Sequence, residues 1–179
     1  MKISDLVEKN NLLCDPNKSF APYTGKVEGS VKCELIDGIL NGVWVEFFEH
    51  GKISSIINYD KIKISTNYKA FYSNGNPKEE WKEYKNKWDG QFSNYYENGN
   101  LREKKNYNKG TLNEEYDYYL SNSEIKEDKF YIGGRLEGNY FIYYRTGHFW
   151  IKSQYKNGKL EGNSEVCFES RKLEENWTI

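Results

Sequence analysis

The sequence predicts an all-β protein: an elongated single layer of antiparallel β-hairpins, built from about six 24-residue repeats and preceded by a non-repeat N-terminal cap. Three observations predict this class. The 179 residues include 16 Tyr, 9 Phe and 5 Trp, and aromatic residues favour the pleated, half-buried surface of a strand. Aromatic pairs recur at a constant interval, and glycines recur at the same interval, which is typical of a repeat architecture.

The interval is 24 residues and needs no gap or insertion. The second residue of each aromatic pair gives the series Phe48, Tyr72, Tyr96, Leu120, Tyr144 and Phe168. Three residues later the series is Gly51, Gly75, Gly99, Ser123, Gly147 and Arg171. A third series keeps the same register and consists of Gly42, Thr66, Gly90, Glu114, Gly138 and Gly162. Because several series share one register, each interval predicts one structural unit.

Each unit is interpreted as a β-hairpin. In the first complete unit, residues 42–49 ("GVWVEFFE") predict one arm and residues 52–60 ("KISSIINYD") the other. Asn-Gly and related pairs supply the positive φ that a tight turn requires, so stretches such as "YYENGN" mark an arm end and a turn. Two strands per unit, each about 4.8 Å apart, predict a rod on the order of 60 Å long.

Two regions follow from the period. Residues 1–30 lack it and predict a leader that caps the first hairpin, whereas residues 31–179 predict the repeat array, continuous with the cap as one structural domain. The sixth unit carries Ser164, Cys167 and Arg171 where other units have aromatic residues or glycine. These substitutions predict a closing repeat, because terminal repeats are atypical.

Charge and cysteine content exclude several function classes. The net charge is −1 and the Lys and Glu residues are interleaved, so the sequence predicts no nucleic-acid partner. Three irregularly spaced cysteines argue against a disulfide framework. Asp5 and Glu8 lie where a signal peptide needs an apolar run, and no stretch approaches a membrane span. We therefore expect a cytoplasmic protein without integral membrane association.

One pattern resembles a known family. The stretch "GQFSNYYENGNLRE" carries its spaced glycines, aromatic residues and acid at Gly90, Phe92, Tyr95, Tyr96, Gly99, Leu101 and Glu103. It resembles the bacterial variant of the MORN (membrane occupation and recognition nexus) repeat, and residues 5–30 are similar to the opening of many bacterial proteins of this type. The resemblance covers about residues 5–179. It implies a hairpin array that binds and neutralises a partner protein, because many similar proteins are called antitoxins of a toxin-antitoxin family; others are linked to membranes or scaffolds.

The fourth unit, residues 110–133, departs most from the repeat. It replaces two glycines by Glu114 and Ser123. It also gathers six acids, at Glu114, Glu115, Asp117, Glu124, Glu127 and Asp128. Such a cluster would suit a basic partner, for example a nucleic-acid-degrading toxin, and it would equally suit a solvated face. Glu114, Glu115 and Asp117 are therefore candidate partner-binding residues.

A second departure is Trp150. Its equivalents in the other units are polar, namely Ser54, Lys78, Arg102, Lys126 and Glu174. An exposed Trp beside Phe149 and His148 is a candidate binding anchor, since Trp is enriched at interface hot spots. Local repacking of the fifth hairpin is the alternative. His148, Phe149 and Trp150 complete the candidate partner-binding set.

The sequence predicts no catalytic residue, no cofactor site and no metal site. His50 and His148 flank turn glycines, and no Cys or Ser pairs with them at an informative spacing. The recurrent acids are expected to pair with Lys or Arg on neighbouring strands, as Glu79, Glu103, Glu127 and Glu175. We therefore predict a non-catalytic protein-binding module that acts as an antitoxin or immunity protein by direct binding to a toxin. The alternative is a MORN-type scaffold or membrane-associated assembly protein.

Overall fold

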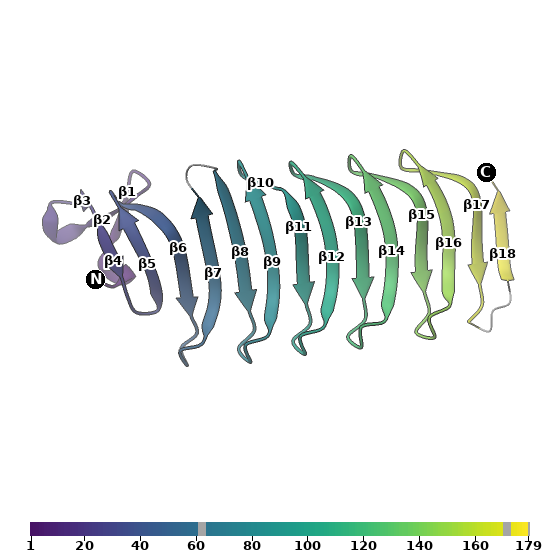
Figure 1. Ribbon diagram of the computed structural model, residues 1–179, viewed down its shortest axis with the longest axis horizontal. Coiled ribbons are helices and arrows are strands. Elements are labelled where there is room, and N and C mark those ends of the chain that lie inside the picture. Colours follow the sequence, from purple (N-terminus) through teal and green to yellow (C-terminus); the bar gives the residue numbers. More distant parts are fainter. Residues whose placement is uncertain (61–63, 170–172, 179) are drawn as a thin grey trace. The chain divides into compact units, whose positions relative to one another are not determined.

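The computed structural model describes residues 1–60, 64–169 and 173–178 (Figure 1), with side chains described as far as residue 169. Its described residues form antiparallel β-strands and two short 3-10 helices, so the predicted all-β hairpin meander is confirmed. Arg171 lies outside the described residues, as do the side chains of Glu174 and Glu175. The chain divides into two compact units, residues 1–86 and 87–179.

The first unit begins with the leader. Its two 3-10 helices, η1 (Ile3–Asp5) and η2 (Pro16–Lys18), flank a three-stranded antiparallel sheet of β1 (Val7–Lys9), β2 (Leu12–Asp15) and β3 (Ala21–Pro22). The larger sheet then runs strand by strand through β4 (Gly25–Val27), β5 (Val31–Ile36), β6 (Ile39–Phe47), β7 (Ile53–Asp60), β8 (Ser65–Phe71) and β9 (Pro77–Tyr84). Each of these strands pairs with the next in antiparallel register.

The leader covers the start of this sheet. Leu35 on β5 is 0% exposed and packs with Leu6 and Val27 from the leader, together with Val31 and Cys33 of its own strand. Together these residues form an apolar cluster of buried side chains. The leader therefore buries the first strand of the array, while the placement of a boundary at residue 30 remains a prediction.

The second unit repeats the hairpin. It consists of β10 (Lys87–Trp88), β11 (Gly90–Tyr95), β12 (Leu101–Asn108), β13 (Thr111–Tyr119), β14 (Ile125–Ile132), β15 (Arg135–Tyr143), β16 (Phe149–Lys156), β17 (Lys159–Cys167) and β18 (Leu173–Thr178). From β11 onward each strand pairs with the next, antiparallel. Trp88 packs on Phe92 and Tyr107, with ring centroids 5.3 Å and 4.9 Å away. It therefore belongs to the packed aromatic side chains of this unit.

The hairpin turns have one geometry. At the first, the Phe48 amide donates to the Lys52 carbonyl at 2.8 Å and the Gly51 amide to the Phe48 carbonyl at 2.8 Å. The same two bonds recur at Tyr96, where Gly99 has a φ of 90°. A side chain with a Cβ rarely adopts this conformation, which is why the period places glycine there.

Glu114 occupies one of these glycine positions with a φ of 69°. Because a left-handed conformation is strained for a residue with a Cβ, we expect Glu114→Gly to raise the free energy of unfolding by about 0.5–1 kcal/mol. Urea denaturation measures it. Glu115→Gly is the matched control: its φ is not positive, so the substitution should lower stability by a similar amount. A loss of stability in Glu114→Gly would show that its side-chain contacts outweigh the strain.

Candidate partner-binding face

Strand alternation and register bring acids and aromatic rings together on one face of the second unit. On β13, Glu115, Asp117 and Tyr119 point to one side because successive side chains alternate. Asp117 lies directly opposite Asp128 on β14, and Asp128 lies opposite Phe141 on β15. We call this set the acidic-aromatic face and define it as Glu115, Asp117, Tyr119, Asp128, Phe141, Tyr143 and Trp150.

The two aspartates form the centre of this face. The hydroxyl of Tyr119 donates to Asp117 Oδ2 at 3.2 Å. Burial, together with the charges of Asp117 and Glu115, raises the pKa of Asp128. Glu115 pairs with Lys104 at 3.2 Å, but among the described side chains no Lys or Arg forms an ion pair with either aspartate. The centre of the face therefore carries two carboxylates that form no ion pair in the described part of the chain, although Lys104, which pairs with Glu115, lies directly opposite Asp117 in register.

Aromatic side chains border the aspartates. Burial and the nearby Asp117, Asp128 and Glu115 raise the pKa of Tyr119 to about 12, and burial with Asp128 and Asp117 also raises the pKa of Tyr143. Both phenols therefore stay neutral at physiological pH. The Phe141 and Tyr143 rings lie 5.9 Å apart. The aspartates thus sit beside flat apolar surface that a partner's side chain could contact.

Trp150 lies on the same side of the sheet. Phe141 is opposite Lys152 in register, and Trp150 precedes Lys152 by two residues. Its side chain is 39% exposed, its ring lies 6.0 Å from the Tyr144 ring, and Lys126 Nζ lies 5.7 Å from the Trp150 ring centroid. The expected exposed position is therefore confirmed, and the ring also packs on its neighbours; the anchor role stays a prediction.

The opposite side of the sheet is a packed ladder of rings and ammonium groups. Lys105 Nζ lies 4.6 Å from the Phe92 ring centroid, and Lys129 Nζ lies 4.1 Å from that of Tyr116. The two lysines pair with the acids two residues earlier on their own strands, Glu103 at 3.2 Å and Glu127 at 2.8 Å. These four charged groups therefore neutralise one another in pairs.

The sequence of the first repeats matches a known protein family. Residues 40–61, 66–86 and 88–109 match the MORN repeat variant. MORN repeats generally mediate binding to proteins or membranes. No curated protein matches the chain. The expected resemblance to the MORN repeat is thus confirmed for these three stretches, whereas the bacterial, antitoxin-like family stays a prediction. The same 24-residue register continues through the strands that follow them.

The hairpin geometry separates the six candidate residues. It brings Glu115, Asp117 and Trp150 onto one face. Glu114 points to the other side of β13, and alternation likewise places Phe149 opposite to Trp150. His148 lies in the turn before β16, where its carbonyl accepts the Tyr144 amide at 2.8 Å.

Sequence reasoning gathered the acids by proximity along the chain and did not apply strand alternation to the partner-binding set. It left Asp128 out of the candidate set and missed Tyr119, Phe141 and Tyr143. The repeat itself predicts the position of Asp128. Ser55 lies opposite Glu46, and the residues three periods later, Glu127 and Tyr118, also lie opposite each other. Asp128 must then face Asp117.

One expectation about the recurrent acids is wrong in detail. Glu103 and Glu127 do pair with lysines, but these lysines, Lys105 and Lys129, lie two residues later on the same strands. The adjacent strand places a tyrosine opposite each lysine, Tyr116 opposite Lys105 and Tyr140 opposite Lys129. At Glu79 no ion pair forms among the described residues; its neighbour Glu80 pairs with Lys69 at 3.0 Å.

The cysteines and His50 are held within the fold. Cys14, Cys33 and Cys167 are buried free thiols, as the irregular spacing predicted. His50 stacks on Phe48 at 5.4 Å and lies 3.3 Å from the Ser73 carbonyl, so it joins neighbouring turns. In the part of the chain that the structure describes, no three His, Cys, Asp or Glu side chains gather as a metal site would require. Nor does that part contain a helix long and apolar enough to cross a membrane.

The aspartate pair makes stability depend on pH. Because the pKa of Asp128 is raised in the folded state, the folded protein binds this proton more tightly than the unfolded chain does. The repulsion between the carboxylates of Asp117 and Asp128 is therefore fully present only above the raised pKa. We expect Asp128→Asn to stabilise the fold by about 0.5–1 kcal/mol at neutral pH, because like charges directly opposite are destabilising. The gain should vanish below the ordinary carboxyl range. Denaturation across pH measures it, with the exposed Glu124→Gln as a control that shows no such pH dependence.

Proposed function

We propose that this chain is a non-catalytic protein-binding module of the antitoxin or immunity type, which neutralises a partner toxin in the cytoplasm by direct binding. The observation that carries the proposal is the aspartate pair, Asp117 opposite Asp128, which forms no ion pair with a described Lys or Arg side chain and which aromatic rings border. MORN repeats supply the wider class, since they bind proteins or membranes.

The chemistry of the face favours a basic protein. A guanidinium group placed between Asp117 and Asp128 would form charge-assisted hydrogen bonds with both carboxylates. Its stem would cover Phe141 and Tyr143, and Trp150 would add a large apolar contact at the edge. An enzyme that degrades nucleic acid presents such cations, because it must contact phosphates. The face would repel an anionic lipid surface, which disfavours the membrane-associated alternative.

Affinity for a co-purified partner tests the proposal. A tagged copy is used to recover a stoichiometric partner from the native cell, and calorimetry then compares the wild type with Asp117→Asn/Asp128→Asn. We expect at least about 100-fold weaker binding, since two charged hydrogen-bond acceptors are lost. Inhibition of the partner's toxic activity should fall in parallel.

Glu114→Gln is the matched control. It removes one negative charge from the same strand but from the other face, so affinity should stay within about threefold of the wild type. Equal weakening by Glu114→Gln would reduce the effect to overall charge and refute the acidic-aromatic face as the site. A partner without toxic activity would refute the neutraliser and favour a scaffold.

A further inference from the structure

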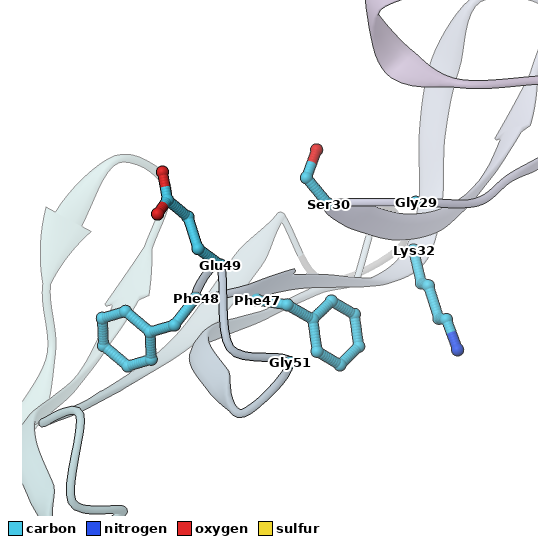
Figure 2. A pocket seen from close by; sticks show the side chains of 7 residues that line it. All are labelled: Gly29, Ser30, Lys32, Phe47, Phe48, Glu49 and Gly51. Carbon is cyan, nitrogen blue, oxygen red and sulfur yellow. The ribbon is translucent and has the colours of Figure 1, made fainter.

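A hollow in the first unit shares no residue with the acidic-aromatic face. Its volume is ≈ 490 Å³, and it opens between Gly29 and Ser30 on one side and the turn from Phe47 to Gly51 on the other (Figure 2). Lys32 closes one end, with its ammonium 5.4 Å from the Phe47 ring centroid. The hollow therefore has two aromatic rings, a backbone turn and charged side chains at its border.

The repeat explains why the hollow exists. Val31 lies opposite Glu46, and the residues four periods later, Glu127 and Ile142, also lie opposite each other. Ser30 therefore occupies the position that Lys126 has in a later repeat, and Gly29 occupies that of Ile125. Two small residues thus stand where a later repeat has large ones. The chain leaves open at the first turn a space that side chains fill at later turns.

Later repeats also show what this space normally supplies. Tyr119 and Tyr143 are the equivalents of Phe47 in later repeats, and the backbone carbonyl of each accepts a side-chain hydrogen bond. Tyr96 Oη donates to the Tyr119 carbonyl at 2.8 Å, and Lys126 Nζ donates to the Tyr143 carbonyl at 2.8 Å. The carbonyl equivalent to that of Glu49 is at Ser121, which accepts from Asn98 and Asn100, each at 2.8 Å. Each of these donors comes from the preceding repeat.

At the first turn these donors are missing. Thr24 stands in the position of Tyr96 but bonds to Asp37 instead, with the Asp37 amide donating to Thr24 Oγ1 at 2.9 Å. Ser30, in the position of Lys126, is too short to reach across. No described side chain donates to the carbonyl of Phe47 or Glu49. The first turn thus presents acceptors that later turns have satisfied.

We propose that this hollow receives a tight turn of a partner protein, whose side-chain hydroxyl and amide groups donate to the Phe47 and Glu49 carbonyls. Hydrogen-bond complementarity favours such a donor-rich turn: Glu49 adds a carboxylate acceptor to the lining, and the one lining cation, Lys32, already pairs with Glu28 at 3.9 Å. The occupant is a different protein and not a second copy, because the donors of the described turns at Tyr96 and Tyr144 are committed to the repeat that follows.

The test uses the full-length chain, isotope-labelled for NMR, and a head-to-tail cyclised peptide with the sequence of residues 95–103, "YYENGNLRE". This probe carries Tyr96, Asn98 and Asn100, the donors that serve the equivalent carbonyls within the array. We expect saturable shift changes in the amides of Ser30 and of Phe47 to Gly51. A peptide with Tyr96→Phe, Asn98→Ala and Asn100→Ala should bind at least about tenfold more weakly.

Two protein variants make the result specific. Ser30→Arg restores a long side chain at the position of Lys126 and should fill the hollow, so peptide binding should fall at least about tenfold while the melting temperature is kept or raised. Ser54→Arg, the same position one repeat later, should bind the peptide as the wild type does. Shift changes elsewhere, equal binding of the donor-free peptide, or unchanged binding to Ser30→Arg would each overturn the proposal. Shifts of these amides that depend on protein concentration alone would overturn it in favour of self-association.

Discussion

Replacing Lys129 by methionine is expected to lower the free energy of unfolding by about 2–3 kcal/mol. Lys129 and Glu127 pair at 2.8 Å with only 15% and 23% of their side chains exposed. The Lys129 ammonium also lies 4.1 Å from the Tyr116 ring centroid, and Tyr140 donates to Glu127 at 2.9 Å. The substitution leaves a largely buried carboxylate without its cation, which costs more than the pair contributes when intact. Urea denaturation measures the loss.

The matched control is Lys104→Met. Lys104 pairs with Glu115 at 3.2 Å, but Glu115 is 60% exposed, so this substitution should cost at most about 1 kcal/mol. The double variant Lys129→Met/Glu127→Gln should recover part of the loss, because it removes the unpaired charge. Equal losses in Lys129→Met and Lys104→Met would mean that the ladder of rings and ammonium groups contributes no more than a surface ion pair.

The second large effect is expected at Leu35. It is 0% exposed and packs against Leu6 and Val27, so Leu35→Ala should lower the free energy of unfolding by about 3 kcal/mol through lost burial and a new cavity. Removal of residues 1–22 should destabilise the chain further, since it uncovers the same cluster. Both losses are read from denaturation curves.

Ile36→Ala serves as the control for Leu35→Ala. Ile36 is the next residue on the same strand, faces the other way and is 41% exposed, so its truncation should cost well under 1 kcal/mol. If Leu35→Ala and Ile36→Ala cost the same, or if removing the leader leaves the melting temperature unchanged, the leader is not a cap.

The hairpin architecture could be predicted because turn chemistry is local. Each turn needs a residue with positive φ, which glycine adopts most readily, so the period appears directly in the residues. The strand bounds were harder. Residues 42–49 were expected as the first arm, but β6 runs from Ile39 to Phe47, because Gly42, with a φ of 85°, lies inside the strand. Glycine within a strand is typical of a local irregularity and was interpreted as a boundary.

The candidate site was less accessible for a different reason. Which acids share a face depends on alternation and register, and the register was implicit in the repeat at Glu46 and Ser55. The pairing of Lys129 with Glu127 depends instead on how long side chains pack around Tyr116 and Tyr140. No spacing rule encodes that choice. Leu35 shows the same limit: Tyr59, Tyr107, Tyr131 and Tyr155 occupy its position in later units, Glu83 occupies it in another, and only the leader's position explains the aliphatic residue.

The side-chain bonds between successive turns give the array a direction. His50 reaches Ser73, Asn98 reaches Ser121, and Tyr144 reaches Cys167, so a turn supplies donors to the repeat after it. Duplicating an internal repeat would therefore preserve each such bond and leave the acceptor-bearing first turn as it is. Gene duplication can lengthen this type of array without redesigning its starting end, which allows the amount of lateral surface to evolve separately from whatever binds at the first turn.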